Sequence, residues 1–420
     1  MISLEKINEA LNAFAVYVKL SRLREKWSLR DFSKETKLSH TFLNKVENVS
    51  VKLTKSSYEK ITRAFKHNLR EKPELVALIE SRKVLFHEAV FYNDQVKIEK
   101  IYAELKPHET YYFSSLQLAD YLLIMQGYAY MRNVLYNEHN TQYDEYLYSV
   151  VERLSKDQEP LFYMYRGLSR YKFNDIDKAL KDLLTAIDIT TDNKIHALSG
   201  MIIGRIYSDQ YKLFEAEHYF KKTRIIYERY NHFMSSVYIK VYEAITQLKL
   251  QRFESLDRDF KNLLSLSDQI VLKPFKNLIL SHYMYYKLAL KEYQEVIKFS
   301  DSEIDEDARF YFYYAFAEHH LKNTLNTDFY NDVLKHQPSD AEDEMYQTGL
   351  RFVILLNAQG TMNKSNFQLA ENYFNKAISI KYYLDAQLMF PYIIEYYTKT
   401  RQYKKAHELN LLMINIMRGK

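Results

Sequence analysis

The chain has 420 residues, of which 47% are hydrophobic, so it can bury a large core and is long enough for two or more domains. It contains only 7 glycines and 6 prolines, whereas turn-rich β architectures need both residues at their tight turns. This scarcity predicts an all-α protein. The absence of cysteine excludes disulfides, thiolate nucleophiles and cysteine-ligated metal sites.

The net charge of +5 is spread unevenly along the chain. Residues 1–70 hold 15 Lys and Arg against 7 Asp and Glu, a net charge of +8, whereas residues 71–420 hold 44 against 47, a net charge of −3. A basic head on a nearly neutral body indicates that the head meets a polyanion. No signal peptide and no segment as long as a membrane span is found, so we expect a cytoplasmic protein without a membrane partner.

The basic head contains two helices separated by a tight turn. Ser28 is predicted to cap the first helix, with Asp31 three residues later completing a variant of the capping box. The turn falls at Lys37-Leu38, and Ser39 is predicted to cap the second helix, His40–Glu47. Two short helices, a tight turn and a polar outer face on the second helix are typical of a helix-turn-helix.

The stretch from Ser28 to Asn48 resembles the phage-repressor-like XRE family of helix-turn-helix domains, most strongly over Ser39–Asn48. Three positions depart from the pattern of that family. Lys37 and Val49 stand where glycine is usual, and Leu29 stands where a polar residue is usual. The resemblance implies an XRE-type DNA-binding domain over residues 1–70 with double-stranded DNA as its partner.

The candidate DNA-binding residues divide by role. The outward polar positions of the second helix would read base edges, because Asn can bond adenine and Lys can reach guanine or a phosphate. Basic residues around the motif would hold phosphates and position the head without reading sequence. The predicted DNA-binding residues are Arg22, Arg24, Arg30, Lys34, Ser39, His40, Thr41, Asn44 and Lys45.

The rest of the chain carries a helical repeat. Gly127, Gly167 and Gly204 lie 40 and 37 residues apart, and Ala216 and Phe220 follow the last of them at the spacing seen in the preceding copy. This pattern resembles the tetratricopeptide repeat, in which small residues let paired helices pack closely. It predicts about seven to nine degenerate repeats that form a right-handed solenoid over residues 71–420.

A solenoid of this kind has a concave face that suits an extended peptide or a segment of another protein. The repeat register places side chains from three successive repeats on this face, although Met and Leu on a repeat helix more often pack in the core. Arg205 would bind a peptide carboxylate through both guanidinium arms or would pair with a neighbouring acid. The predicted peptide-binding residues are Met164, Leu168, Tyr171, Met201, Arg205, Ser208, Val241 and Ile245, with Leu248 on the same face.

The order of the two parts is informative. An XRE-type head followed by a long degenerate repeat array resembles the RRNPP group of peptide-sensing regulators (the Rgg, PlcR, PrgX and NprR proteins). The resemblance implies a transcriptional regulator controlled by a short signalling peptide in quorum sensing. It also implies a homodimer in which peptide binding changes the separation of two DNA-binding heads.

Other functions are weighed against this interpretation. The sequence has no Gly-rich phosphate loop, no GxSxG and no HExxH motif, and its 13 histidines are not clustered, so we expect no enzymatic activity, no cofactor and no metal site. Two alternatives stay open. The repeats of a DNA-binding regulator would bind a protein partner instead of a peptide, or the chain would be a repeat scaffold without specific DNA binding.

Overall fold

The computed structural model describes residues 3–66, 69, 71–136, 141–267, 273–298, 307–321, 325 and 327–417. Every regular element within these ranges is a helix, which confirms the predicted all-α fold. The chain forms two compact units. Unit 1 comprises residues 1–206 and 222–232, and unit 2 comprises residues 207–221 and 233–420.

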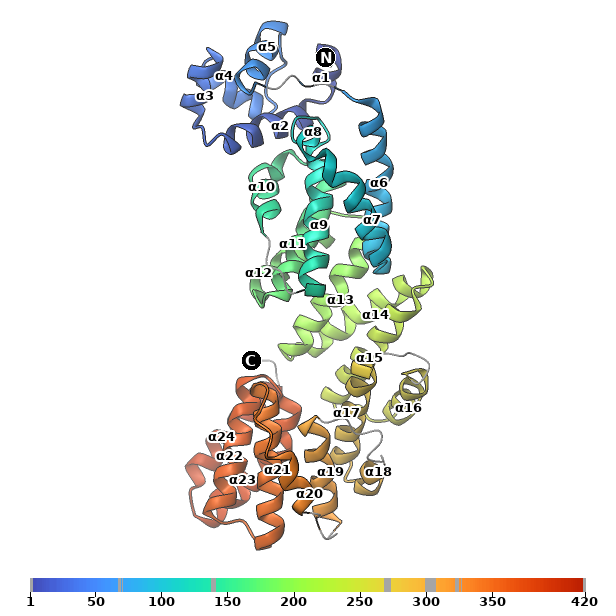
Figure 1. The fold of residues 1–420 in the computed structure, drawn as a ribbon. Helices are drawn as coiled ribbons and strands as arrows, with labels where there is room; N and C mark the ends of the chain where they lie inside the picture. The colour runs from blue at the N-terminus through green and yellow to red at the C-terminus, as the bar shows by residue number, and fades with distance from the viewer. Residues whose placement is uncertain are drawn as a thin grey trace. The chain divides into compact units, whose positions relative to one another are not determined.

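Unit 1 begins with the head, drawn in blue in Figure 1. Its helices are α1 (Leu4–Glu9), α2 (Leu11–Arg24), α3 (Leu29–Thr36), α4 (His40–Glu47) and α5 (Lys55–Ala64). Both predicted caps are present. Ser28 Oγ accepts a hydrogen bond from the Asp31 amide at 3.2 Å while the Asp31 carboxylate accepts one from the Ser28 amide at 3.2 Å, and Ser39 Oγ accepts one from the Phe42 amide at 3.2 Å. The two helices of the predicted helix-turn-helix therefore begin where local capping chemistry places them.

The two positions where the sequence lacks the usual glycine are both left-handed. Lys37 ends α3 with φ 55°, and Val49 follows α4 with φ 56°. A left-handed conformation costs a non-glycine residue about 1–2 kcal/mol, and a β-branched residue adopts it least readily. The tertiary fold of the head therefore fixes the backbone here against local preference.

A single hydrophobic core holds the head together. Trp27 stacks on Phe32 and Phe65, with ring centroids 6.1 and 5.8 Å away. The buried members of this core come from all five helices and from the segments that follow α4 and α5. They are Ile7, Phe14, Tyr17, Val18, Phe32, Leu43, Val46, Leu53, Tyr58, Ile61, Phe65 and Leu69.

The remaining helices of unit 1 pack in sequence, α6 against α7 and α9, and α11 against α9 and α12. They are α6 (Pro73–Tyr92), α7 (Gln95–Leu105), the 3-10 helix η1 (Lys106–His108), α8 (Glu109–Tyr112), α9 (Leu118–Tyr136), α10 (Gln142–Val150), the 3-10 helix η2 (Val151–Arg153), α11 (Gln158–Lys172), α12 (Ile176–Asp188) and α13 (Asn193–Asp209). The boundary between the units passes through α13 and α14.

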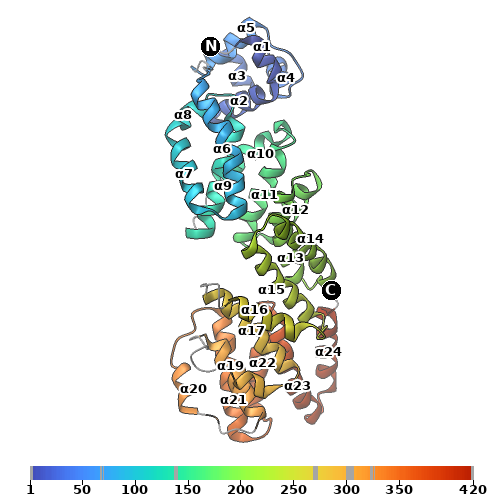
Figure 2. The same cartoon turned by 90° about the vertical axis from the view of Figure 1, so that its right-hand side faces the viewer.

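Unit 2 repeats the same arrangement, with α19 against α21, α21 against α22 and α22 against α23 (Figure 2). Its helices are α14 (Leu213–Arg229), α15 (Phe233–Lys249), α16 (Leu256–Ser267), α17 (Lys273–Ala289), α18 (Tyr293–Ile297), α19 (Ala308–His320), α20 (Thr327–Val333), α21 (Ala341–Gln359), α22 (Lys364–Ser379), α23 (Tyr383–Lys399) and α24 (Tyr403–Met417). Packing between successive helices is the organisation of a repeat solenoid.

A recurring turn explains how the chain makes so many helix ends with so few glycines. Asn174, Tyr211, Gln251 and Lys291 each end a helix in the left-handed conformation, at φ values between 57° and 62°. In each turn the next amide bonds back to the carbonyl five residues earlier, as at Asp175 N and Arg170 O (2.9 Å), which is the Schellman motif. These four turns lie 37, 40 and 40 residues apart, so the period read from the sequence is confirmed.

Two of the three predicted glycines, Gly127 and Gly167, mark close helix packing. A Cβ atom added at Gly167 would lie 2.7 Å from Leu183 Cγ, and one added at Gly127 would lie 2.7 Å from a ring carbon of Phe86. Gly349, which the sequence interpretation did not single out, is held in the same way against Tyr373. A larger residue at these positions would force the paired helices apart.

Candidate DNA-binding face and ligand cavity

The recognition helix predicted from the sequence exposes its polar side. His40, Thr41, Asn44 and Lys45 of α4 are all exposed, whereas Leu43 is fully buried. Asn44 Oδ1 accepts a hydrogen bond from Asn48 Nδ2 at 3.1 Å, which orients its amide. The structure therefore leaves the four predicted base-reading side chains at the surface of one helix.

The flanking predicted residues divide into two groups. Ser39 is exposed at the N-cap of α4, and Arg30 and Lys34 are exposed on α3, where Lys34 Nζ lies 3.7 Å from an Asp31 carboxylate oxygen. These three remain available for phosphate contact. Arg24 is exposed as well, but its guanidinium lies 4.0 Å from the centroid of the Phe113 ring. Arg24 thus already packs against the segment that follows α8.

Arg22 does not fit its predicted role as a phosphate contact. Its side chain is 10% exposed, and its Nε and Nη2 donate to the two carboxylate oxygens of Glu47 at 2.6 and 2.9 Å. Its Nη1 donates to the Trp27 carbonyl at 2.8 Å. A bidentate Arg–carboxylate pair of this kind fixes two segments in one geometry. Arg22 therefore joins α2 to the end of α4, and periodicity could not show this because the partners lie 25 residues apart.

Arg153 connects the end of α4 to η2 and was missed by the sequence interpretation. Its Nε donates to the Glu47 carbonyl at 2.9 Å, and its Nη2 donates to Asn48 Oδ1 at 2.5 Å. Because Asn48 also bonds Asn44, a chain of hydrogen bonds runs from η2 to a predicted base reader. A basic residue in a short segment 105 residues away carries no local signal of this contact.

Four of the predicted peptide-binding residues are core residues. Met164 and Leu168 of α11 are 1% and 2% exposed, and Val241 and Ile245 of α15 are 0% and 4% exposed. None of these four side chains lines the cavity described below. These four apolar side chains therefore pack in the core instead of serving as surface contacts.

The other predicted peptide contacts are more varied. Met201, Tyr171 and Arg205 are partly exposed in unit 1, and the Arg205 guanidinium lies 5.3 Å from the centroid of the Tyr171 ring. Their role as peptide contacts stays a prediction. Ser208 is 2% exposed, and both its hydroxyl and its carbonyl oxygen accept hydrogen bonds from Lys249 Nζ at 3.0 Å. Ser208 is therefore a buried hydrogen-bond partner of Lys249.

Unit 2 contains a cavity of about 580 Å³. This volume is within the range of ligand sites in proteins, roughly 300–1,000 Å³. Its walls combine aromatic and aliphatic side chains from α15, α17, α19 and α23 with a few charged groups. The lining includes Leu248, Lys249, Phe253, Tyr285, Leu288, Lys291, Tyr293, Phe316, His320, Leu384, Gln387, Leu388, Pro391, Tyr392 and Glu395.

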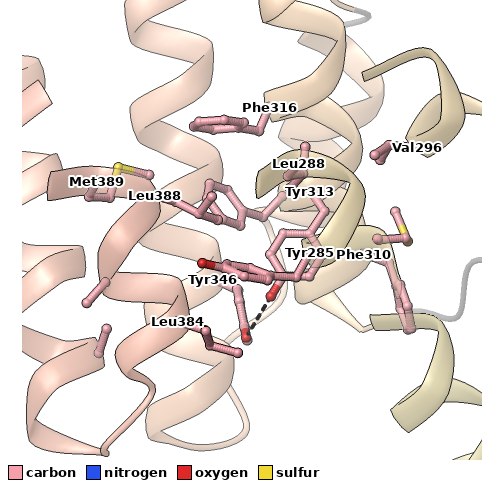
Figure 3. Packing of buried hydrophobic residues seen from close by; sticks show 14 of the residues in the cluster. Tyr285, Leu288, Val296, Phe310, Tyr313, Phe316, Tyr346, Leu384, Leu388 and Met389 are labelled. Atoms are coloured by element: carbon pink, nitrogen blue, oxygen red, sulfur yellow. Dashed lines mark hydrogen bonds between the residues drawn. The ribbon is translucent and has the colours of Figure 1, made fainter. Parts of the chain in front are cut away.

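Figure 3 shows buried hydrophobic residues of unit 2, among them some that line the cavity. Tyr285, Phe316 and Leu388 line the cavity, and Tyr313 and Tyr346 belong to the same hydrophobic cluster without lining it. The hydroxyl groups of Tyr313 and Tyr346 lie 3.5 Å apart. A rigid aromatic wall of this kind offers a large apolar contact area.

A buried carboxylate, that of Asp385, lies next to these tyrosines. Asp385 of α23 is 6% exposed and accepts hydrogen bonds from the hydroxyl groups of Tyr313 at 2.6 Å and Tyr373 at 3.3 Å. Burial raises the pKa of Asp385, although these hydrogen bonds and the nearby Arg309 act in the opposite direction. Asp385 therefore belongs to the core behind the cavity and does not line it.

His320 lies in the cavity wall as a neutral ring. It stacks on Tyr293 with centroids 4.6 Å apart and an interplanar angle of 9°, and its Nε2 lies 2.9 Å from the Tyr392 hydroxyl. Burial lowers the pKa of His320 to about 4. The ring therefore contributes an aromatic surface and no positive charge at neutral pH.

The described part of the chain holds no group of three or more His, Asp or Glu side chains placed to bind a metal ion. Within the same ranges, every helix is too short or too polar to cross a membrane.

The comparisons with known proteins bear on the fold. The sequence matches no protein-family model and no curated protein. Solved structures are similar in fold: the apo form of the quorum sensor NprR from B. thuringiensis has a TM-score of 0.59 at 13% identity, covering 81% of this chain and 98% of that chain. NprR in complex with its cognate peptide NprX has a TM-score of 0.54 at 14% identity, with the same coverage.

A Rap protein complexed with the Competence and Sporulation Factor is similar as well, with a TM-score of 0.55 at 15% identity, covering 83% of this chain and 98% of that chain. Identities this low indicate a shared fold and nothing finer. The predicted resemblance to the RRNPP architecture and to tetratricopeptide-like repeats is therefore confirmed for the fold.

Proposed function

We propose that this protein is a cytoplasmic, DNA-binding transcriptional regulator whose repeat region binds a short signalling peptide, as in quorum sensing. The observation that carries the proposal is the exposed polar side of α4, which the buried Arg22–Glu47 pair holds in place. A helix of this kind in a helix-turn-helix enters the major groove of DNA. The basic balance of residues 1–70 adds attraction to the phosphates.

The peptide part of the proposal draws on the cavity and on the structural neighbours. One neighbour is a quorum sensor solved with its cognate peptide, and another is a Rap protein solved with the Competence and Sporulation Factor. This chain has a cavity of suitable size within the same kind of fold. A peptide that binds one conformation of the repeats more tightly than another would shift the population of DNA-binding arrangements.

The homodimer in this proposal has a candidate surface on α24. Its exposed apolar side chains are Tyr403, Leu411, Leu412, Ile414 and Met417, which are 40–63% exposed. Exposed apolar side chains gathered on one helix mark an interaction surface, so this helix favours burial against a second copy. A Leu411→Glu/Ile414→Glu variant is expected to sediment as a monomer where the wild type sediments as a dimer. A wild-type monomer at micromolar concentration would contradict this part.

The experiment for the whole proposal is binding of the full chain to DNA from upstream of its own gene, with and without peptides encoded by adjacent small reading frames. We expect the Asn44→Ala/Lys45→Ala variant to lose about 10- to 100-fold in affinity, because a good base contact contributes about 1–3 kcal/mol. Removing Lys45 should also reduce the slope of log affinity against log salt concentration by about 1, the amount expected for one lost phosphate contact. Lys404→Ala, which removes an exposed lysine of α24, is the control for charge.

The outcomes separate the candidate functions. Sequence-specific binding that depends on Asn44 and Lys45 and changes with one peptide supports the proposal. Specific binding that no peptide alters would leave a regulator with a protein partner. Failure to bind DNA even at low salt, where attraction to phosphates is strongest, would leave a repeat scaffold.

A further inference from the structure

The charged groups of the cavity in unit 2 do not balance. Lys249 and Lys291 line it together with a single acid, Glu395. Glu395 already forms an ion pair with Lys399, one turn further along α23. With two lysines against one glutamate, the lining carries an excess of positive charge. A positive cavity concentrates anions.

Lys249 is the focus of this excess. It is partly buried at the end of α15, and its ammonium donates two hydrogen bonds to the carbonyl and hydroxyl oxygens of Ser208, both at 3.0 Å. Among the described residues no carboxylate forms an ion pair with it, and Asp209 acts only from a distance. Burial accordingly lowers the pKa of Lys249. An ammonium has three donors, so one hydrogen remains for a further acceptor.

The rest of the lining fits an apolar ligand with polar backbone atoms. Tyr285, Phe316 and Tyr392 present aromatic surface to the cavity. Pro391 lies inside α23 and has no amide hydrogen, so the Gln387 carbonyl lacks its usual helical donor. Both residues line the cavity. A carbonyl freed in this way can accept a hydrogen bond from a ligand amide.

We propose that this cavity binds its ligand through a carboxylate that pairs with Lys249, while the apolar body of the ligand packs on the aromatic wall. Under the proposed function, on which the identity of the ligand rests, the carboxylate is the free C-terminus of the signalling peptide. Lys249 then supplies the charge-assisted contact that orients the peptide, and the Gln387 carbonyl accepts one of its backbone N–H groups.

The test uses a synthetic hexapeptide library prepared in two versions, one with free C-terminal carboxylates and one with C-terminal amides. The full chain is mixed with both, and the retained peptides are quantified by mass spectrometry. We expect free-acid peptides to be retained about 10- to 100-fold better than their amides, the range for a hydrogen bond to a charged group. Lys249→Met should remove this preference without lowering the retention of amides.

Matched variants separate ligand binding from support of the fold. Lys249→Arg keeps the charge and should keep the preference for free acids, which leaves the test valid if Lys249→Met folds poorly. Lys404→Met removes an exposed lysine on α24 and should leave the preference unchanged. If Lys249 served only to hold Ser208, Lys249→Met would lower the thermal midpoint while the retained peptides still favoured free acids. That result would overturn the proposal.

A second probe, sodium 4-phenylbutyrate, tests whether the site binds a small organic acid instead of a peptide C-terminus. Retention of peptides regardless of their C-terminal group would overturn the role of Lys249 and leave the proposed peptide sensing intact. Thermal protection by 4-phenylbutyrate that requires Lys249, with no peptide retained, would keep the carboxylate site and overturn the peptide part of the proposed function. No binding of any of these probes would overturn the inference.

Discussion

Arg22 in the head is a buried cation and Lys249 in unit 2 is a partly buried one, and their partners differ. Arg22 is held by both carboxylate oxygens of Glu47 at 2.6 and 2.9 Å. Lys249 has the two oxygens of Ser208 and the Tyr211 ring, whose centroid lies 5.6 Å from its Nζ, but no carboxylate among the described residues. Unit 2 can pair a buried lysine with acids, because Lys287, 6% exposed, bonds both Asp257 and Glu292. Burial alone would lower the pKa of Lys287, but these two partners raise it.

The presence or absence of a carboxylate partner distinguishes a cation that stabilises the fold from one that can bind a ligand. Burying a charge without a partner is costly, so a cation that serves only the fold is expected to be paired. Arg22 and Lys287 satisfy this expectation, and Lys249 does not. The unpaired cation also lies at the wall of a cavity, whereas Arg22 lies between two helices of the head. Breaking each kind of contact should therefore have different consequences.

The largest effect is expected from Glu47→Gln, which leaves the buried Arg22 without its counter-charge. Breaking one partner of a buried pair costs about 3–5 kcal/mol. Trp27 is the single tryptophan of the chain and packs in the core of the head, so urea unfolding followed by its fluorescence reports on the head alone. Glu35→Gln, at an exposed acid of α3, is the control. A loss no larger than in that control would mean that the pair does not stabilise the head.

The features predicted correctly are those that depend on neighbours in sequence. The caps at Ser28 and Ser39 follow from residues within three positions of one another. The period of the repeats follows from small residues that each face the next helix. Such signals are local, so a single sequence contains them.

The features missed depend on contacts between distant segments. The sequence pattern predicts a surface cation at Arg22, but Arg22 pairs with Glu47, which lies 25 residues later in the chain. The cavity draws side chains from residues 248 to 395, and of the predicted groove residues only Leu248 lines it. Helical periodicity separates two faces of a helix, but it does not tell which apolar face meets another helix and which meets a cavity. Met164 and Val241 are buried residues that periodicity alone does not distinguish from groove residues.

Asp385 is an acid for which burial disfavours the charged form, as it does for the basic Lys249. It therefore gives a prediction about pH dependence. Its folded-state pKa is raised by burial, so its contribution to stability is present below the pKa of the unfolded chain and is lost as pH rises through the folded-state value. Asp385→Asn should therefore raise the thermal midpoint at pH 7 and weaken its dependence on pH in the acidic range. Asp328→Asn, at an exposed acid of α20, is the control.

Thermal melting by circular dichroism between pH 4 and 8 measures this difference. The groups that face Asp385 are the hydroxyls of Tyr313, Tyr346 and Tyr373 and the guanidinium of Arg309. If Asp385→Asn lowers the midpoint at pH 7, these groups stabilise the ionised carboxylate more than burial opposes it. Asp385 would then be a paired, fold-holding charge like Arg22.

The smallest effect is expected from Arg153→Ala, because Arg153 is a paired cation at the edge of the head and not within its core. The variant removes two hydrogen bonds to the end of α4, each contributing about 0.5–1.5 kcal/mol. We expect faster amide hydrogen exchange in α4 and unchanged exchange in α21–α23, with Arg63→Ala on α5 as the control. Because Asn48 also orients Asn44, DNA affinity should fall less than in Asn44→Ala/Lys45→Ala. Unchanged exchange in α4 would show that the hydrogen bonds from Arg153 do not stabilise this helix. The Arg22–Glu47 pair would then be sufficient to hold α4 in position.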